Sequence, residues 1–72
     1  MVSVGSFVKF TWWSSYKAPS VSNDDGKTSW HEINPGDIGV VLCIKDEEHI
    51  VVLFSHVDSL LTVHKSMVSL VD

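Results

Sequence analysis

The stretch that decides the fold is residues 34–54, NPGDIGVVLCIKDEEHIVVLF. It reads as a turn, an apolar strand, a short charged turn and a second apolar strand, which is the pattern of a β-hairpin. We expect the strands over residues 37–45 and 49–54, with the turn at 46–48. Two strands of this kind belong to an all-β domain, so the stretch predicts a small β-barrel or β-sandwich.

Both faces of this hairpin are apolar. Side chains alternate along a strand, and here each alternate set is apolar. In the first strand, one face holds Ile38, Val40, Leu42 and Ile44, and the other holds Gly39, Val41 and Cys43. In an antiparallel sheet with one face exposed to water, apolar and polar residues should instead alternate along each strand. We therefore expect either that the bends of a barrel bury parts of both faces or that another chain covers one of them.

On the N-terminal side of the hairpin, a first strand is expected over residues 5–13. Alternation places Val8 and Phe10 toward the core, and it places Lys9 and Thr11 toward water. The alternation of apolar and small residues here also differs from a signal peptide, which has a positive start and a long apolar segment.

Residues 14–36 separate this strand from the hairpin and show no sustained periodicity, so a long loop is predicted. The loop could fold back as a short irregular hairpin about a turn at residues 23–26, NDDG. Loops of this length are usually functional or disordered. The presence of Tyr16, Trp30 and His31 argues against disorder.

On the C-terminal side, a strand is expected over residues 60–64, one turn of 3₁₀ helix over 65–67 and a closing strand over 68–71. The alternation in 60–64 leaves two choices open for the inward set. These are Leu61 with Val63, or Leu60 with Thr62.

Five short strands, a long first connection and a 3₁₀ turn before the last strand resemble an SH3-like barrel, here a single domain over residues 1–72. The segment 36–41, GDIGVV, also looks like the glycine-bearing turn of KOW-type domains, which share that barrel. The chain is similar to small uncharacterised proteins of tailed bacteriophages. That resemblance rests on residues 4–10 (VGSFVKF), 51–54 (VVLF) and 63–71 (VHKSMVSLV), besides the hairpin. It implies a phage protein acting in the host cytoplasm or on the virion, and it implies no particular activity.

Composition excludes several classes of function. The 72 residues are 44% hydrophobic and 19% charged, which is typical of a globular domain, and no apolar run is long enough to cross a membrane. The net charge is −4, and the five basic residues are scattered lysines without an arginine. Nucleic-acid binding is therefore disfavoured. A lone cysteine, Cys43, cannot form an internal disulfide, which fits a reducing cytoplasm.

No catalytic or metal-binding pattern is present in the sequence. The histidines, His31, His49, His56 and His64, lack the spacing of zinc ligands. Cys43 lies between Leu42 and Ile44, which indicates packing rather than a reactive thiol. We therefore expect no catalytic residue, no metal and no cofactor, and we predict that the chain is not an enzyme.

The aromatic residues give the sharper signal of a binding site. Tryptophan and tyrosine are over-represented at binding hot spots, and in SH3-like domains the long first loop carries the peptide groove. The predicted partner-binding residues are Trp12, Trp13, Tyr16, Trp30 and His31. An equally open alternative is that Tyr16 and Trp30 only hold the loop over a thin core.

The sequence thus predicts a non-enzymatic protein-binding module that docks on a host protein or a virion component. The contact would use the aromatic region or the outer face of the hairpin. Two alternatives stay open, namely a KOW-like nucleic-acid or transcription-associated module, and a small structural virion accessory protein that forms homo-oligomers.

Overall fold

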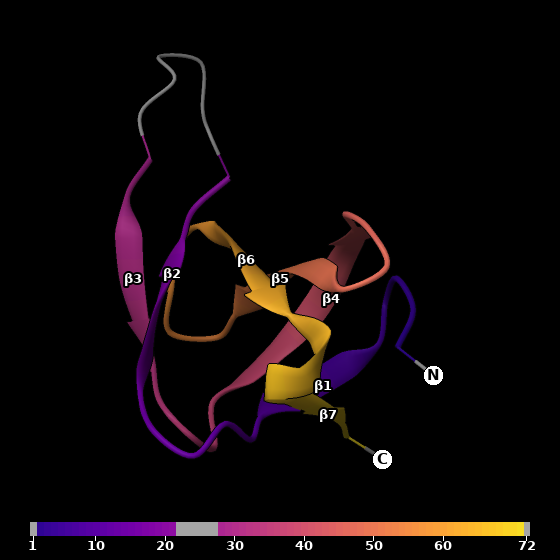
Figure 1. The fold of residues 1–72 in the computed structure, drawn as a ribbon, viewed down its shortest axis with the longest axis horizontal. Coiled ribbons are helices and arrows are strands. Elements are labelled where there is room, and N and C mark those ends of the chain that lie inside the picture. The colour runs from indigo at the N-terminus through magenta and orange to yellow at the C-terminus, as the bar shows by residue number, and fades with distance from the viewer. Residues whose placement is uncertain (1, 22–27, 72) are drawn as a thin grey trace.

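A computed structural model describes residues 2–21 and 28–71 of the chain (Figure 1). Strands and one 3₁₀ turn account for the regular structure of these residues. The elements are β1 (Phe7–Phe10), β2 (Tyr16–Pro19), β3 (Trp30–Ile33), β4 (Ile38–Ile44), β5 (His49–Phe54), β6 (Leu60–His64), η1 (Lys65–Met67) and β7 (Val68–Leu70). The prediction of an all-β fold is confirmed.

The strands form two separate sheets. Five of them make an antiparallel sheet in the order β6-β5-β4-β1-β7, and β2 pairs with β3 in a hairpin of its own. The prediction of a closed barrel of five strands is therefore wrong in two respects, because both sheets are open and the described residues form seven strands.

The additional strands lie in the segment that was predicted as a long loop. Tyr16 pairs with Ile33, and Pro19 pairs with Trp30, so β2 and β3 run antiparallel. This is the fold-back that the sequence left open, although the predicted turn at residues 23–26 lies outside the described residues. The hairpin is held in place because Ala18 and Ile33 give it an apolar face, and both side chains are completely buried.

Other boundaries follow the predictions closely. The strands over 49–54 and 60–64 and the 3₁₀ turn over 65–67 have the predicted bounds. The first strand is shorter than predicted, because it ends at Phe10 rather than at residue 13. The pairing stops there because both neighbouring strands are antiparallel to β1 and begin at this level. Lys9 pairs with Ile38, the first residue of β4, and Phe10 pairs with Val68, the first residue of β7.

The core lies between the inner face of the large sheet and the β2–β3 hairpin. The centre of the inner face is a cross-strand row of Val41, Val52 and Leu61, none of which is exposed. Phe10 packs edge-to-face on Phe54, with ring centroids 6.3 Å apart. Leu61 rather than Leu60 therefore points inward, which decides the choice that the sequence left open.

The hairpin is attached to the sheet at its β6 edge. Ser20 forms a bridge with Leu61, and the Val21 N–H donates to the Leu60 carbonyl at 2.8 Å. The His56 ring nitrogen Nε2 lies 3.1 Å from the Glu32 carbonyl oxygen. These contacts attach the hairpin to the β6 edge, with Ala18 and Ile33 on the inner side. At this edge, Pro19 and Val21 line a hollow together with Val51 and Thr62 of the outer side.

A register shift between Val41 and Cys43 interrupts the pairing of β4 with β5. One extra residue in a strand reverses the direction of the side chains that follow it. Ile44 is consequently paired with Ile50, whose side chain is buried, and no longer shares the face of Val40. The predicted common face of Ile38, Val40, Leu42 and Ile44 is therefore wrong beyond the shift.

Candidate functional site

The outer face of the large sheet carries a continuous row of apolar side chains. Phe7 pairs with Val40, Val40 with Leu53, and Leu53 with Leu60, so the row crosses β1, β4, β5 and β6 in succession. We call these four residues the outer row. Phe7 is 60% exposed and Leu60 is 38% exposed, while Val40 and Leu53 are half-buried.

A hollow of about 500 Å³ lies over this row. Its floor is the sheet, and one wall is the connection between β5 and β6, which is folded against the sheet by the bond from the Ser55 N–H to the Ile38 carbonyl. We call this hollow the outer groove. Its lining comprises Phe7, Ile38, Gly39, Val40, Leu53, Phe54, Ser55, Val57 and Asp58. Asp58 is the one charged side chain in that lining.

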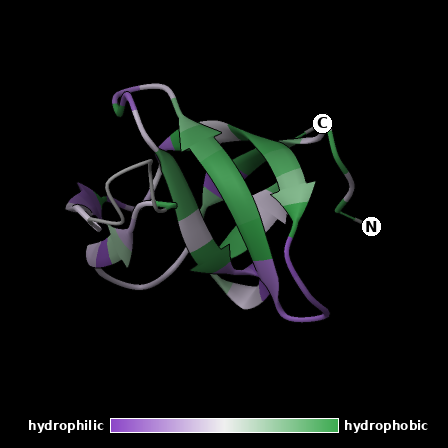
Figure 2. Cartoon of the chain, turned by 90° about the horizontal axis from the view of Figure 1, so that it is seen from above, coloured by the Kyte–Doolittle hydropathy of each residue, from purple (hydrophilic) through white to green (hydrophobic). Residues whose placement is uncertain are grey.

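The hydropathy of the ribbon agrees with this description. Figure 2 shows the strands of the large sheet as a broad hydrophobic area, and the hydrophilic residues gather in the turns at its ends. A groove with apolar walls and a charged residue at its rim suits an apolar side chain or segment from another protein.

The predicted aromatic residues do not form one cluster. Trp12 is half-buried against the core, and the ring of Trp13 lies 6.4 Å away with 81% of the residue exposed. Tyr16 begins β2, whereas Trp30 lies opposite Pro19 at the far end of the hairpin. Tyr16 and Pro19 are three steps apart along the strand, which is a rise of about 10 Å.

The hairpin also directs these residues to opposite sides. Residues paired across an antiparallel ladder point the same way, so His31 lies on the face of Ala18, which is buried, and Trp30 lies on the other face with Pro19. The Nε2 atom of His31 is buried without a hydrogen-bond partner in the described part of the chain. His31 therefore faces the core, whereas Trp13 and Trp30 are exposed at separate places.

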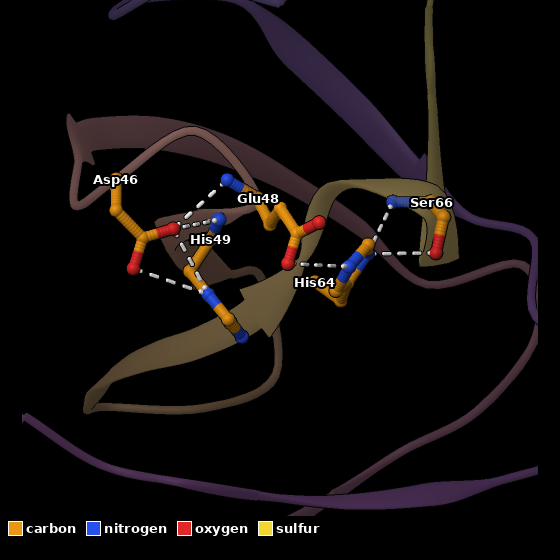
Figure 3. A network of polar contacts seen from close by, with 5 residues as sticks. All are labelled: Asp46, Glu48, His49, His64 and Ser66. Atoms are coloured by element: carbon orange, nitrogen blue, oxygen red, sulfur yellow. Dashed lines mark hydrogen bonds and ion pairs between the residues drawn. The ribbon is translucent and has the colours of Figure 1, made fainter.

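A polar network occupies the end of the sheet at the β4–β5 turn (Figure 3). The Asp46 carboxylate accepts the N–H groups of Glu48 and His49, each at 2.8 Å, and it lies 3.0 Å from the His49 ring nitrogen Nδ1. The hydrogen bond from the Glu48 N–H, followed by that with the His49 side chain, lowers the pKa of Asp46 below 3.8. This network shapes the turn.

The same network caps the 3₁₀ turn. His64 pairs with His49 across the strands, with ring centroids 5.3 Å apart. The His64 Nδ1 atom accepts the Ser66 N–H at 3.1 Å, and its Nε2 atom lies 3.8 Å from the Glu48 carboxylate. The hydrogen bonds of this network join residues of the β4–β5 turn and of the 3₁₀ turn, so they serve local structure.

Among the described residues, no group of three histidine, cysteine or acidic side chains has an arrangement that could hold a metal ion. Cys43 is exposed rather than packed as the sequence indicated. The reason is the register shift, since Cys43 pairs with Val51 on the outer face. Its sulfur atom lies 3.7 Å from the Ile44 carbonyl oxygen.

Comparison of the chain with protein-family models, with curated proteins and with solved structures gave no match. Among the residues that the structure describes, there is no helix with the length and hydropathy needed to span a membrane.

Sequence reasoning named the outer face of the hairpin as one of two possible contact surfaces, but it did not predict a row that crosses four strands. Two signals pointed to this row. One is the hairpin that is apolar on both faces, and the other is the alternation of the first strand, which puts Phe7 on the same side as Lys9 and Thr11. The missing information was the pairing, which brings Phe7 beside Val40 and so joins the first strand to the hairpin.

Proposed function

We propose that this chain is a non-enzymatic protein-binding module that docks through the outer groove. The observation that carries the proposal is the outer row, in which Phe7, Val40, Leu53 and Leu60 lie side by side on the outer face, with Phe7 and Leu60 exposed at its ends. An apolar row with exposed ends loses contact with water when another chain packs on it, and that loss is favourable. Aromatic anchors such as Phe7 are typical of such contacts.

The resemblance to small tailed-phage proteins suggests the class of partner, which is a host protein or a virion component. The fold proposal that accompanies it is an SH3-like module with an open sheet. It is supported by the strand order β6-β5-β4-β1-β7 and by the 3₁₀ turn between β6 and β7. The KOW-like nucleic-acid alternative is less well supported, because the net charge is −4 and the chain lacks arginine.

Site-specific photo-crosslinking tests the proposed surface. A photoreactive phenylalanine analogue replaces Phe7 in one variant and Trp13 in a matched control, since both side chains are exposed. Each variant is irradiated in a bacterial lysate and as a purified protein, and the adducts are identified by mass spectrometry. We expect discrete protein adducts from position 7 in at least one of the two conditions.

The control decides between the two candidate surfaces. Discrete adducts from position 13 without any from position 7 would move the contact to the aromatic region that the sequence predicted. Absence of a protein adduct from position 7 in both conditions would refute docking through the outer groove.

A further inference from the structure

Two opposite charges stand on the two sides of the outer groove. Lys9 is exposed on β1, next to Ile38 in the register. Asp58 is exposed on the connection that follows β5, where it lines the groove. Because β4 lies between β1 and β5 in the sheet, these two charges flank the apolar floor from opposite sides.

Both charges also lie near the same level along the strands. Lys9 pairs with Ile38, and Ile38 accepts the N–H of Ser55 at the base of the connection that carries Asp58. None of the ion pairs within the described part of the chain involves Lys9 or Asp58. The face therefore presents a positive flank, an apolar centre and a negative flank.

This order of charges is complementary to itself. A two-fold axis between the two copies can run parallel to β4 above Val40. Rotation about this axis leaves each residue at the same position along the strand direction, and it exchanges the β1 side of the sheet with the β5 side. It lays β1 of one copy over β5 of the other, so Phe7 meets Leu53 at the centre. It also brings Lys9 of each copy to the connection that carries Asp58 in the other copy.

We propose that a second copy of this chain occupies the outer groove, in a two-fold dimer that packs the outer rows face to face. The inference rests on the proposed function, because it names the partner of that same surface. Apolar sheet faces pack on one another with their strands roughly aligned, and the mixed charges at the rim set the orientation of the two copies.

The size of the face sets the strength of the dimer. Four strands about 4.8 Å apart and the length of β4 limit the footprint on each copy to about 440 Å² at most, because residues of the β2–β3 hairpin border its Val51 end. Two such footprints bury on the order of 900 Å², which lies below the range of stable complexes. We therefore expect a weak dimer that forms at high protein concentration and not at low concentration.

Analytical ultracentrifugation of the full chain between about 10 and about 500 µM tests the dimer, since contacts of this size are weak. We expect the average mass to rise from one copy toward two. Phe7→Ser should stay monomeric throughout, and Trp13→Ala, which changes an exposed aromatic residue outside the groove, should behave as the unmodified chain does.

Charge reversal tests the two-fold arrangement itself. Lys9→Asp and Asp58→Lys should each weaken the dimer about three- to tenfold, because each creates two repulsive pairs by symmetry. The double variant restores both pairs in swapped form, so its dissociation constant should return to within about twofold of the original. Both positions are exposed, so circular dichroism is expected to report an unchanged fold.

A wild-type chain that stays monomeric over the whole range would overturn the dimer. So would a double variant that is no better than the single ones. If the chain is monomeric and position 7 crosslinks to a different protein, this inference fails while the proposed function stands. If no crosslink forms from position 7 in either condition and no dimer is found, both fail.

Discussion

The two faces of the five-stranded sheet carry the same kinds of apolar residue but differ in how far these residues are buried. On the inner face, Val41, Val52 and Leu61 form a row that is completely buried. On the outer face, a parallel row of Phe7, Val40, Leu53 and Leu60 is partly exposed. Hydropathy therefore does not decide which face becomes the core.

The inner face becomes the core because the β2–β3 hairpin packs on it. The β2–β3 hairpin places Ala18 and Ile33 on the inner side and is tied to the β6 edge by the Val21 N–H, which donates to Leu60. Among the described residues, this hairpin covers the inner row, whereas the outer row stays partly exposed. Small domains bury a limited share of their surface. The second apolar face is then available to another chain, and the variants below separate the roles of the two faces.

The largest effect is expected for Leu61→Ala on the inner face. The side chain is fully buried, so its removal leaves a cavity, and the cost is about 2–5 kcal/mol. Domains of this size seldom have more than about 3–5 kcal/mol in total. Urea unfolding followed by tryptophan fluorescence should find the variant largely unfolded without denaturant, and a fully stable variant would show that the inner row is not the core.

A smaller loss is expected for Gly39→Ala. A Cβ atom at residue 39 would lie 2.6 Å from the Val52 side chain and 2.9 Å from the Leu53 carbonyl oxygen. Overpacking of this kind costs about 1–3 kcal/mol, and the backbone oxygen cannot move aside without breaking the sheet. Gly36→Ala is not a substitute for this test, since residue 36 has a φ of +99° and would be strained for a different reason. An unchanged urea midpoint for Gly39→Ala would contradict the close approach of β4 and β5.

Leu60→Ala is the matched partner of Leu61→Ala on the outer face. Leu60 is 38% exposed, so truncation should lower the free energy of unfolding by less than about 1 kcal/mol. The measurement is the same urea titration at low protein concentration. A loss as large as that of Leu61→Ala would mean that the two faces do not differ in the way described.

The smallest effect is expected in the β4–β5 turn at the end of the sheet, for Asp46→Asn. The pKa of Asp46 is lowered in the folded chain, so its carboxylate stabilises the fold fully above pH 3.8 and this contribution is lost as the pH falls through the folded value. The variant should therefore lose less stability than the original chain when the pH is lowered from 4 toward 2. Parallel curves for the two proteins would contradict the role of this carboxylate.

The hairpin at residues 34–54 and the segments after it could be predicted from sequence because each signal there is local. Short apolar runs bounded by turns define β5 and β6 without reference to the rest of the chain, and the short segment before the last strand indicates η1. The register shift near Leu42 could not be predicted in this way, because it depends on how β4 meets β5. It is also the reason that Cys43 is exposed and Ile44 leaves the face of Val40.

The candidate site depended on pairing at a distance, and sequence reasoning therefore reached only part of it. The excess of apolar residues on the hairpin was visible, but the neighbour that completes the row, Phe7, comes from β1. The aromatic residues were grouped because they are close in sequence. The β2–β3 hairpin separates them, since it is extended and turns Trp30 and His31 to opposite faces.

The dependence of the urea midpoint on protein concentration directly tests whether the chain associates through its outer face, because association of the folded chain stabilises the fold as concentration rises. For the unmodified chain, we predict a midpoint that increases with concentration. For Phe7→Ser, we predict a midpoint that is independent of concentration and equal to that of the unmodified chain at low concentration. A midpoint that does not change with concentration in the unmodified chain would contradict the account, as would a large loss of stability in Phe7→Ser at low concentration.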